Sequence, residues 1–100
     1  MKQRSARRIK KSLKDLEVIF KGLANKRRLI ILEFLNKRGE SDTGTIADYL
    51  KTDYKIVIPH LEKLLKANLI IKRREGLIVY YQISNLGKRI LNLLRDLIIF

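Results

Sequence analysis

The side chains of this chain that could do chemistry are mainly cations. The 100 residues contain 23 lysines and arginines against 10 aspartates and glutamates, which gives a formal net charge of +13. Such a field attracts polyanions and repels other cations. Nucleic acid is favoured over an anionic membrane as the partner, because a folded core accounts for the apolar residues and no apolar run approaches the roughly 20 residues of a membrane span.

The N-terminal segment is the most basic part of the chain. Residues 1–14 contain seven lysines and arginines and no acidic residue. We expect residues 1–12 to form a flexible basic arm that grips phosphates, and the alternative is a solvated tail that only aids solubility. The DNA contacts predicted for the arm are Arg4, Arg7, Arg8, Lys10 and Lys11. Lys26 and Arg27, at the start of the helix predicted after Asn25, are predicted DNA contacts as well.

Residues suited to catalysis or metal binding are scarce. The chain has no cysteine, which excludes disulfides, thiolate metal sites and cysteine nucleophiles and fits a reducing, cytoplasmic location. The lone His60 has no second ligand at helical spacing, so we expect it to be packed or to face a phosphate. The sequence contains no recognisable nucleophile and base, phosphate loop or metal cluster. We therefore expect no enzyme activity, no cofactor, no metal and no small-molecule ligand.

Helical spacing of apolar residues dominates the first two thirds of the chain. It predicts a first helix of about ten residues capped by Ser12, and then a central, buried helix capped by Asn25. A short helix over 42–51, with Asp42 as its N-cap, and a longer helix over 54–67 are joined closely enough to form a helix-turn-helix.

The period of the pattern then changes. Residues 69–74 and 77–83 are rich in β-branched and aromatic side chains and flank Glu75-Gly76, which predicts a β-hairpin with Tyr81 on its apolar face. Ser84 should cap a last helix. The predicted fold is mainly α with a small β-hairpin (α+β). It is a single winged helix-turn-helix domain over 13–100, with four helices, the hairpin and a final helix in that order.

Three motifs lie in register within residues 16–83. They are Phe20-Lys21-Gly22-Leu23-Ala24-Asn25 with Arg28-Leu29-Ile30-Ile31-Leu32, His60-Leu61 with Leu64, Ala67 and Leu69-Ile70, and Arg73-Arg74-Glu75-Gly76 with Val79-Tyr80-Tyr81. Together they resemble the ArsR family of winged helix-turn-helix transcriptional regulators. The resemblance implies a DNA-binding regulator that forms a homodimer through its first and last helices.

The chain departs from the family pattern where that family binds metals. Asp42-Thr43-Gly44 stand where the family's commonest thiol site begins, and the last helix lacks the histidine of its carboxylate-histidine site. Neither metal site can form from these residues. A further departure is Lys26-Arg27, which replaces the usual Pro-Thr and adds two positive charges.

The helix over 54–67 is the predicted recognition helix. Its exposed early face would enter the major groove, where side chains can distinguish all four base pairs. The predicted contacts on this helix are Tyr54, Lys55, Ile58, His60 and Glu62. Ile56 is expected to pack in the core. Pro59 leaves two alternatives: a helix that continues through it with a kink, which we favour, or a helix that begins at it.

The hairpin is the predicted wing. Lys72, Arg73 and Arg74 lie close to the Gly76 turn, where they could straddle the DNA backbone, and Tyr80 could reach DNA through its hydroxyl. A solvated hairpin tip is the alternative, but the neighbouring helix-turn-helix and the net charge favour contact with DNA.

The first and last helices carry more apolar surface than one small domain can cover. The predicted interface of a homodimer comprises Leu13, Leu16, Phe20, Ile90, Leu93, Leu94, Leu97 and Ile98. The predicted function is therefore a sequence-specific, dimeric regulator of transcription, a repressor that blocks a promoter, with double-stranded DNA as its partner. The alternative is an architectural protein that coats DNA with little specificity. The abundance of Ile, Leu and Lys without cysteine suits a thermophilic source, archaeal or viral.

Overall fold

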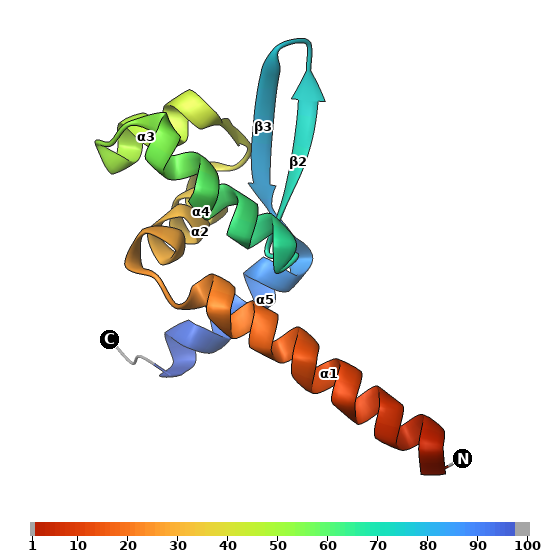
Figure 1. The fold of residues 1–100 in the computed structure, drawn as a ribbon. Coiled ribbons are helices and arrows are strands. Elements are labelled where there is room, and N and C mark those ends of the chain that lie inside the picture. The colour runs from red at the N-terminus through yellow and green to blue at the C-terminus, as the bar shows by residue number, and fades with distance from the viewer. Residues whose placement is uncertain (1, 98–100) are drawn as a thin grey trace.

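The computed structural model describes residues 2–97, with side chains from residue 12 onward. These residues form five helices and three strands: α1 (Lys2–Leu23), α2 (Lys26–Arg38), β1 (Ser41–Asp42), α3 (Thr43–Leu50), α4 (Tyr54–Lys66), β2 (Ile70–Glu75), β3 (Ile78–Ile83) and α5 (Asn85–Leu97). Figure 1 shows how they are arranged. The α+β class, the helix-turn-helix and the hairpin followed by a last helix are confirmed.

The first helix is longer than the sequence predicted. It spans 22 residues, so residues 2–12 of the expected flexible arm are helical and Ser12 lies inside the helix instead of capping it. The physical reason is local, because residues 2–20 contain no Gly or Pro and are rich in the straight-chain residues that favour helix. This N-terminal half of α1 projects away from the rest of the molecule (Figure 1).

Helix α2 lies at the centre, as predicted, and contacts α1, α3, α4, α5 and β3. Its Ile31, Leu32 and Leu35 are fully buried. The expected N-cap is confirmed. The side chain of Asn25 accepts a hydrogen bond from the Arg28 amide at 3.2 Å, and Gly39 ends the helix with a positive φ of 91°.

The sheet has one more strand than the sequence predicted. Its antiparallel order is β1-β3-β2, and the two-residue strand β1 pairs with β3 through Ser41 and Asp42. The hairpin itself is as expected, since Glu75 pairs with Ile78 across a turn in which Gly76 adopts a φ of 61°. On β3, Tyr81 and Ile83 are buried, so the predicted apolar face does cover the helices.

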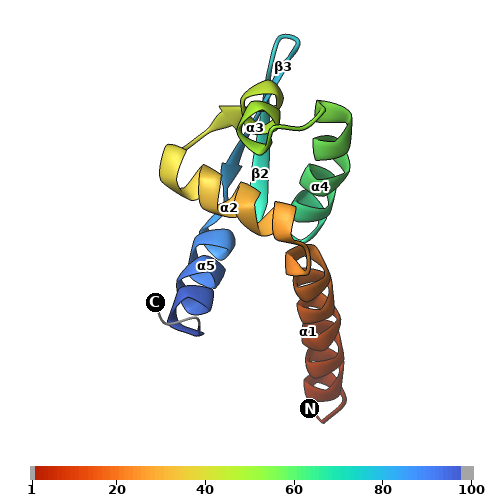
Figure 2. The ribbon, with the colours of Figure 1, turned by 90° about the vertical axis from the view of Figure 1, so that its left-hand side faces the viewer.

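The two ends of the domain differ in character. In both views α1 and α5 extend from one end, while α3 and the tip of the hairpin lie at the other (Figures 1 and 2). The hydroxyl of Ser84 caps the N-terminus of α5, because it accepts a hydrogen bond from the Gly87 amide at 2.9 Å. The same hydroxyl donates to the Asn68 carbonyl at 2.7 Å. The surface predicted to bind DNA and the surface predicted to bind a second subunit are therefore separated along the molecule.

Candidate nucleic-acid interface

The helix-turn-helix is formed by α3, the turn Lys51-Thr52-Asp53, and α4. Asp42 is the N-cap residue of α3, and its carboxylate accepts a hydrogen bond from the Thr45 hydroxyl, which holds the pKa of Asp42 below its ordinary value. Lys51 takes a left-handed conformation with a φ of 54° and reverses the chain after α3. Asp53 then caps α4, since its carboxylate accepts from the Lys55 amide at 2.9 Å.

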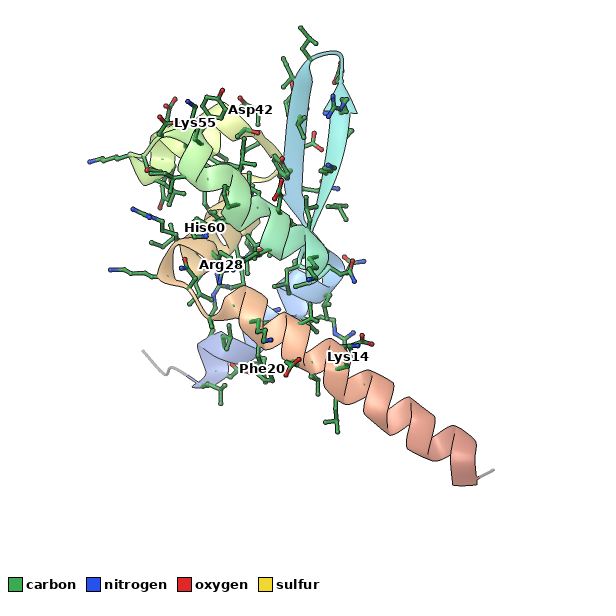
Figure 3. All side chains as sticks on the ribbon, viewed as in Figure 1. Lys14, Phe20, Arg28, Asp42, Lys55 and His60 are labelled. Atoms are coloured by element: carbon green, nitrogen blue, oxygen red, sulfur yellow. The ribbon has the colours of Figure 1, made fainter. Side chains whose placement is uncertain are left out.

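The outer face of α4 carries several of the predicted DNA contacts. Val57, Leu61 and Leu64 are buried along the opposite side of the helix. Tyr54, Lys55 and Glu62 are exposed, as a groove-reading role requires. Figure 3 places Lys55 near the start of α4, at the far end of the molecule from Phe20 on α1.

The two isoleucines of this helix differ in exposure. Ile56, expected in the core, is 43% exposed, so that prediction is wrong. Ile58, expected on the reading face, is half-buried, and it is not one of the half-buried apolar residues that pack against the core. Its contact with DNA therefore stays a prediction.

Pro59 lies inside α4, and residues 54–58 are helical, so the alternative in which the helix begins at the proline is wrong. Proline cannot donate to the carbonyl four residues earlier, which here belongs to Lys55. Both Pro59 and Lys55 are exposed, so water can solvate that carbonyl. The exposed position is the reason the helix tolerates the residue.

His60 faces the interior of the domain through one ring nitrogen. Its Nδ1 lies 3.1 Å from Nη1 of Arg28 on α2 (Figure 3). Because a guanidinium can only donate, Nδ1 accepts and the ring proton resides on Nε2. Burial, followed by the charges of Arg28, Arg27 and Lys63, holds the pKa of His60 below its ordinary value. Of the two alternatives predicted for His60, packing inside the protein therefore applies to the Nδ1 side of the ring, which contacts Arg28.

Arg28 was not among the predicted site residues, although it belongs to the quoted family motif. Its side chain is only 6% exposed, and it donates to the Gly22 carbonyl through Nε at 2.6 Å and to the Lys21 carbonyl through Nη2 at 3.1 Å. Among the described side chains no carboxylate pairs with it. The carbonyl end of α1, which carries the negative pole of the helix dipole, offsets the buried charge. Arg28 thus joins α1, α2 and α4.

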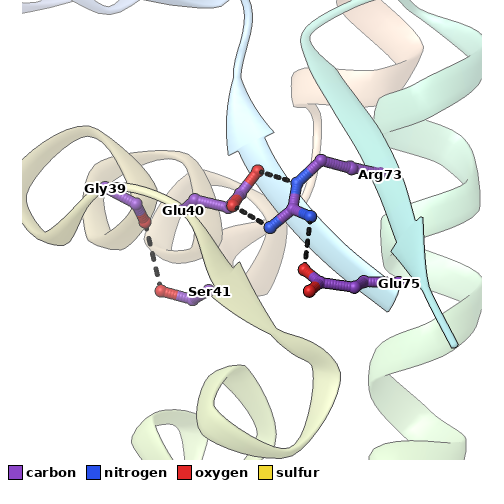
Figure 4. A network of polar contacts seen from close by, with 5 residues as sticks. All are labelled: Gly39, Glu40, Ser41, Arg73 and Glu75. Carbon is purple, nitrogen blue, oxygen red and sulfur yellow. Dashed lines mark hydrogen bonds and ion pairs between the residues drawn. The ribbon is translucent and has the colours of Figure 1, made fainter. Parts of the chain in front are cut away.

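The wing presents its cations on two different faces. Lys72 and Arg74 pair across the hairpin with Tyr81 and Val79, whereas Arg73 pairs with Tyr80. Arg73 is held in a network with two carboxylates, shown in Figure 4. Tyr80 is half-buried beneath it, with the guanidinium 4.6 Å from the ring centroid.

The remaining predicted DNA contacts lie on α1 and at the start of α2. Lys26 and Arg27 are exposed in the first turn of α2, which contains no acidic residue. The arm residues Arg4, Arg7, Arg8, Lys10 and Lys11 lie on the helical segment of α1 whose side chains fall outside the described part.

The predicted dimer residues lie at the other end of the molecule. Leu13, Leu16, Phe20, Leu93 and Leu97 are exposed, with Phe20 at 63% and Leu97 at 71%. Ile90 and Leu94 are half-buried and pack partly against their own core. A hollow of about 390 Å³ between α1, α2 and α5 is lined by Phe20, Leu23, Ala24, Leu29, Glu33, Leu91, Leu94 and Arg95. Ile98 lies outside the described residues.

No helix among residues 2–97 combines the length and the apolar character needed to cross a membrane. The side chains that the structure describes include no group of three or more His, Cys, Asp or Glu placed to hold a metal ion.

The chain is similar in sequence to known regulatory proteins. Residues 25–72 match the model of the family described as bacterial regulatory protein, arsR family. The arsenical resistance operon repressor of Bacillus subtilis is 33% identical over 73 residues, which cover 73% of this chain and 70% of that protein. An HTH-type transcriptional regulator of Methanocaldococcus jannaschii is 34% identical over 80 residues, covering 79% of this chain and 90% of that protein.

Solved structures agree as well. The homodimeric winged helix-turn-helix DNA-binding domain of a possible ArsR-family regulator from Mycobacterium bovis superposes with a TM-score of 0.82 and 31% identity, covering 90% of this chain and 83% of that chain. NolR from Sinorhizobium fredii superposes with a TM-score of 0.78 and 27% identity, covering 90% of each chain.

Proposed function

The chain belongs to the arsR family of bacterial regulatory proteins, and from that premise we propose that it is a sequence-specific repressor that binds double-stranded DNA as a homodimer. The observation that carries the proposal is the exposed early face of α4. Tyr54, Lys55 and Ile56 stand free of the core there, in the position from which a recognition helix enters the major groove. The wing cations Lys72 and Arg74 are exposed as well. A chromosomal DNA partner would place the protein in the cytoplasm.

Footprinting on fragments of the source genome tests specificity. A discrete protected site supports the regulator, whereas uniform coverage supports the architectural alternative. Lys55→Ala should weaken DNA binding. If Lys55 contacts a phosphate, the slope of log K against log salt should fall by about 0.9, the value for one lost phosphate contact. If Lys55 reads a base, the variant should lose preference for the protected site. Lys88→Ala is the matched control, because Lys88 is exposed on α5 at the other end of the molecule. Equal effects of the two variants would contradict the assignment of α4 as the reading element.

Dimerisation is the second part of the proposal. Exposed leucines and Phe20 on α1 and α5 form an apolar surface at the end opposite the wing, and a two-fold contact would cover it. In a dimer the two α4 helices would address half-sites about one helical turn apart.

Solution scattering measures the mass directly. We expect a dimer at micromolar concentration for the wild type and a monomer for Leu93→Asp. Leu77→Asp serves as the control, because Leu77 is 99% exposed at the tip of the wing and should leave the mass unchanged. A monomeric wild type would exclude the dimer.

The proposed regulator does not sense metals through the family's ligands. The sequence has no cysteine, and Asp42, which stands where the thiol site begins, is engaged with Thr45. We expect the DNA affinity to be the same with a chelator and with stoichiometric zinc. A large change on adding the metal would show that another ligand set exists.

A further inference from the structure

The cation at the centre of the wing is engaged with its own protein. We propose that Arg73 is a positioning residue that fixes the wing against the corner between α2 and β1, while Lys72 and Arg74 provide the wing's phosphate contacts. The inference rests on the proposed DNA-binding function and assigns different roles to the three cations that the sequence grouped together.

The contacts of Arg73 occupy most of its donors. Its Nε and Nη2 donate to the two oxygens of Glu40 at 3.2 and 2.7 Å, and its Nη1 donates to Glu75 Oε2 at 2.7 Å. Figure 4 shows the guanidinium between the two carboxylates. Glu40 fills the Nε–Nη2 edge, one of the two edges with which a guanidinium can grip a phosphate through two parallel hydrogen bonds, and Glu75 engages Nη1 of the other edge. A phosphate would have to displace a carboxylate to bind there.

Electrostatics of the free protein favour the same arrangement. The Arg73 hydrogen bond holds the pKa of Glu40 below its ordinary value, and both carboxylates raise that of the Arg73 guanidinium. Both partners therefore stay charged at neutral pH. The ring of Tyr80, 4.6 Å below the guanidinium, adds a cation–π contact and restricts the plane of the fork.

The pleat of the sheet separates Arg73 from its neighbours. Successive residues of a strand point to opposite faces. Arg73 shares a face with Tyr80, whereas Lys72 and Arg74 share the opposite face with Tyr81, which is buried against the helices. Lys72 and Arg74 are therefore on the face of the hairpin that is turned towards the helical core, and within the described side chains neither forms an ion pair.

The wing needs such a restraint. A two-stranded hairpin alone has marginal stability in water, and β1, the third strand of the sheet, pairs with β3 over two residues. Glu40 precedes β1 directly, so the Arg73–Glu40 pair crosses over β3 and ties β2 to the same corner. This contact fixes the direction in which the hairpin, and with it Lys72 and Arg74, projects.

Charge-conserving variants separate positioning from phosphate binding. Arg73→Lys keeps the positive charge but loses the fork that spans Glu40 and Glu75. Arg89→Lys is the matched control, because Arg89 is exposed on α5, outside the wing, and is assigned no contact with DNA. Two quantities are measured for each variant. The first is amide hydrogen exchange over residues 71–82 of the free protein, and the second is affinity for a random-sequence duplex at several salt concentrations.

We expect Arg73→Lys to accelerate exchange in the wing and to weaken DNA binding several-fold, while Arg89→Lys matches the wild type in both. Arg74→Ala should lower the salt slope by about 0.9 at unchanged exchange. The proposal is overturned if Arg73→Lys equals the wild type in either measurement. A wild type that binds no duplex would instead refute the proposed function, and hydrogen exchange would still report whether Arg73 holds the wing.

Discussion

Substitution of Gly87 by alanine tests the packing of α5 most directly. Gly87 is buried in the first turn of α5. A Cβ atom there would lie 2.3 Å from the Leu69 carbonyl oxygen and 2.7 Å from Cγ1 of Ile83. The first distance is about 1 Å shorter than the closest carbon–oxygen contacts between packed segments, which are about 3.3 Å. The Leu69 carbonyl cannot retreat freely, because it accepts from the Ser84 amide at 3.0 Å.

The expected cost follows from these contacts. Overpacking a core costs about 1–3 kcal/mol, and alanine recovers about 0.5–1 kcal/mol relative to glycine within a helix. Because the clash involves a backbone oxygen, we expect the upper part of that range and a net loss of about 2 kcal/mol in the free energy of unfolding. For a domain of this size the loss corresponds to a fall in Tm of about 8–16 °C.

Circular dichroism during thermal and urea unfolding, at one fixed protomer concentration, measures the effect. Gly44→Ala is the control, because Gly44 is an exposed helical glycine whose added Cβ would meet only the Asp42 side chain, at 3.3 Å. That variant should be neutral or slightly stabilised. The reasoning is refuted if Gly87→Ala unfolds at the same temperature as the wild type, or if the two alanine variants are equally destabilised.

Three further outcomes are expected. The lowered pKa of His60 means that the unfolded chain binds a proton more readily than the folded one. The wild type should therefore lose free energy of unfolding as the pH falls from 7 through the ordinary value of 6.5. His60→Gln should lose less of it in a pH series of urea unfolding curves. Arg28→Met should lower the free energy of unfolding by about 2–4 kcal/mol, because it removes the three donors of the Arg28 side chain. Arg28→Lys should restore little of that loss, and full restoration would show that the charge alone matters. Ser84→Ala should cost about 1 kcal/mol through the lost α5 cap, as measured by chemical unfolding, and no change would mean that water replaces the hydroxyl.

Local features of the fold could be predicted because they depend on neighbours in sequence. Apolar periodicity placed the helices and the hairpin, and the caps at Asn25 and Ser84 were found from residue type and position. Continuity of α4 through Pro59 was favoured correctly. The same reasoning fails for β1, since two residues are too few to show a period, and for the N-terminal half of α1, where a run of basic residues without an acid predicts an arm.

The candidate site was predictable only in outline. The exposed face of α4 and the apolar surface of α1 and α5 follow from the pattern. The exposure of Ile56 does not, because the residue is apolar and the packing angle of the helix decides whether it is buried. The Arg28–His60 and Arg73–Glu40 contacts join residues 32 and 33 positions apart, and no spacing rule connects such positions.

The sequence by itself determined the winged helix-turn-helix order, the positive charge, the absence of cysteine and the apolar stripes of the terminal helices. These properties are fixed by composition and by periods of a few residues. Only the tertiary structure decided which cations are free to meet phosphate. Arg28 is buried by the packing of three helices and Arg73 is held by carboxylates, whereas Lys55, Lys72 and Arg74 remain exposed. The physical reason is that a charge is available to DNA only where the fold brings no carbonyl or carboxylate within hydrogen-bonding distance.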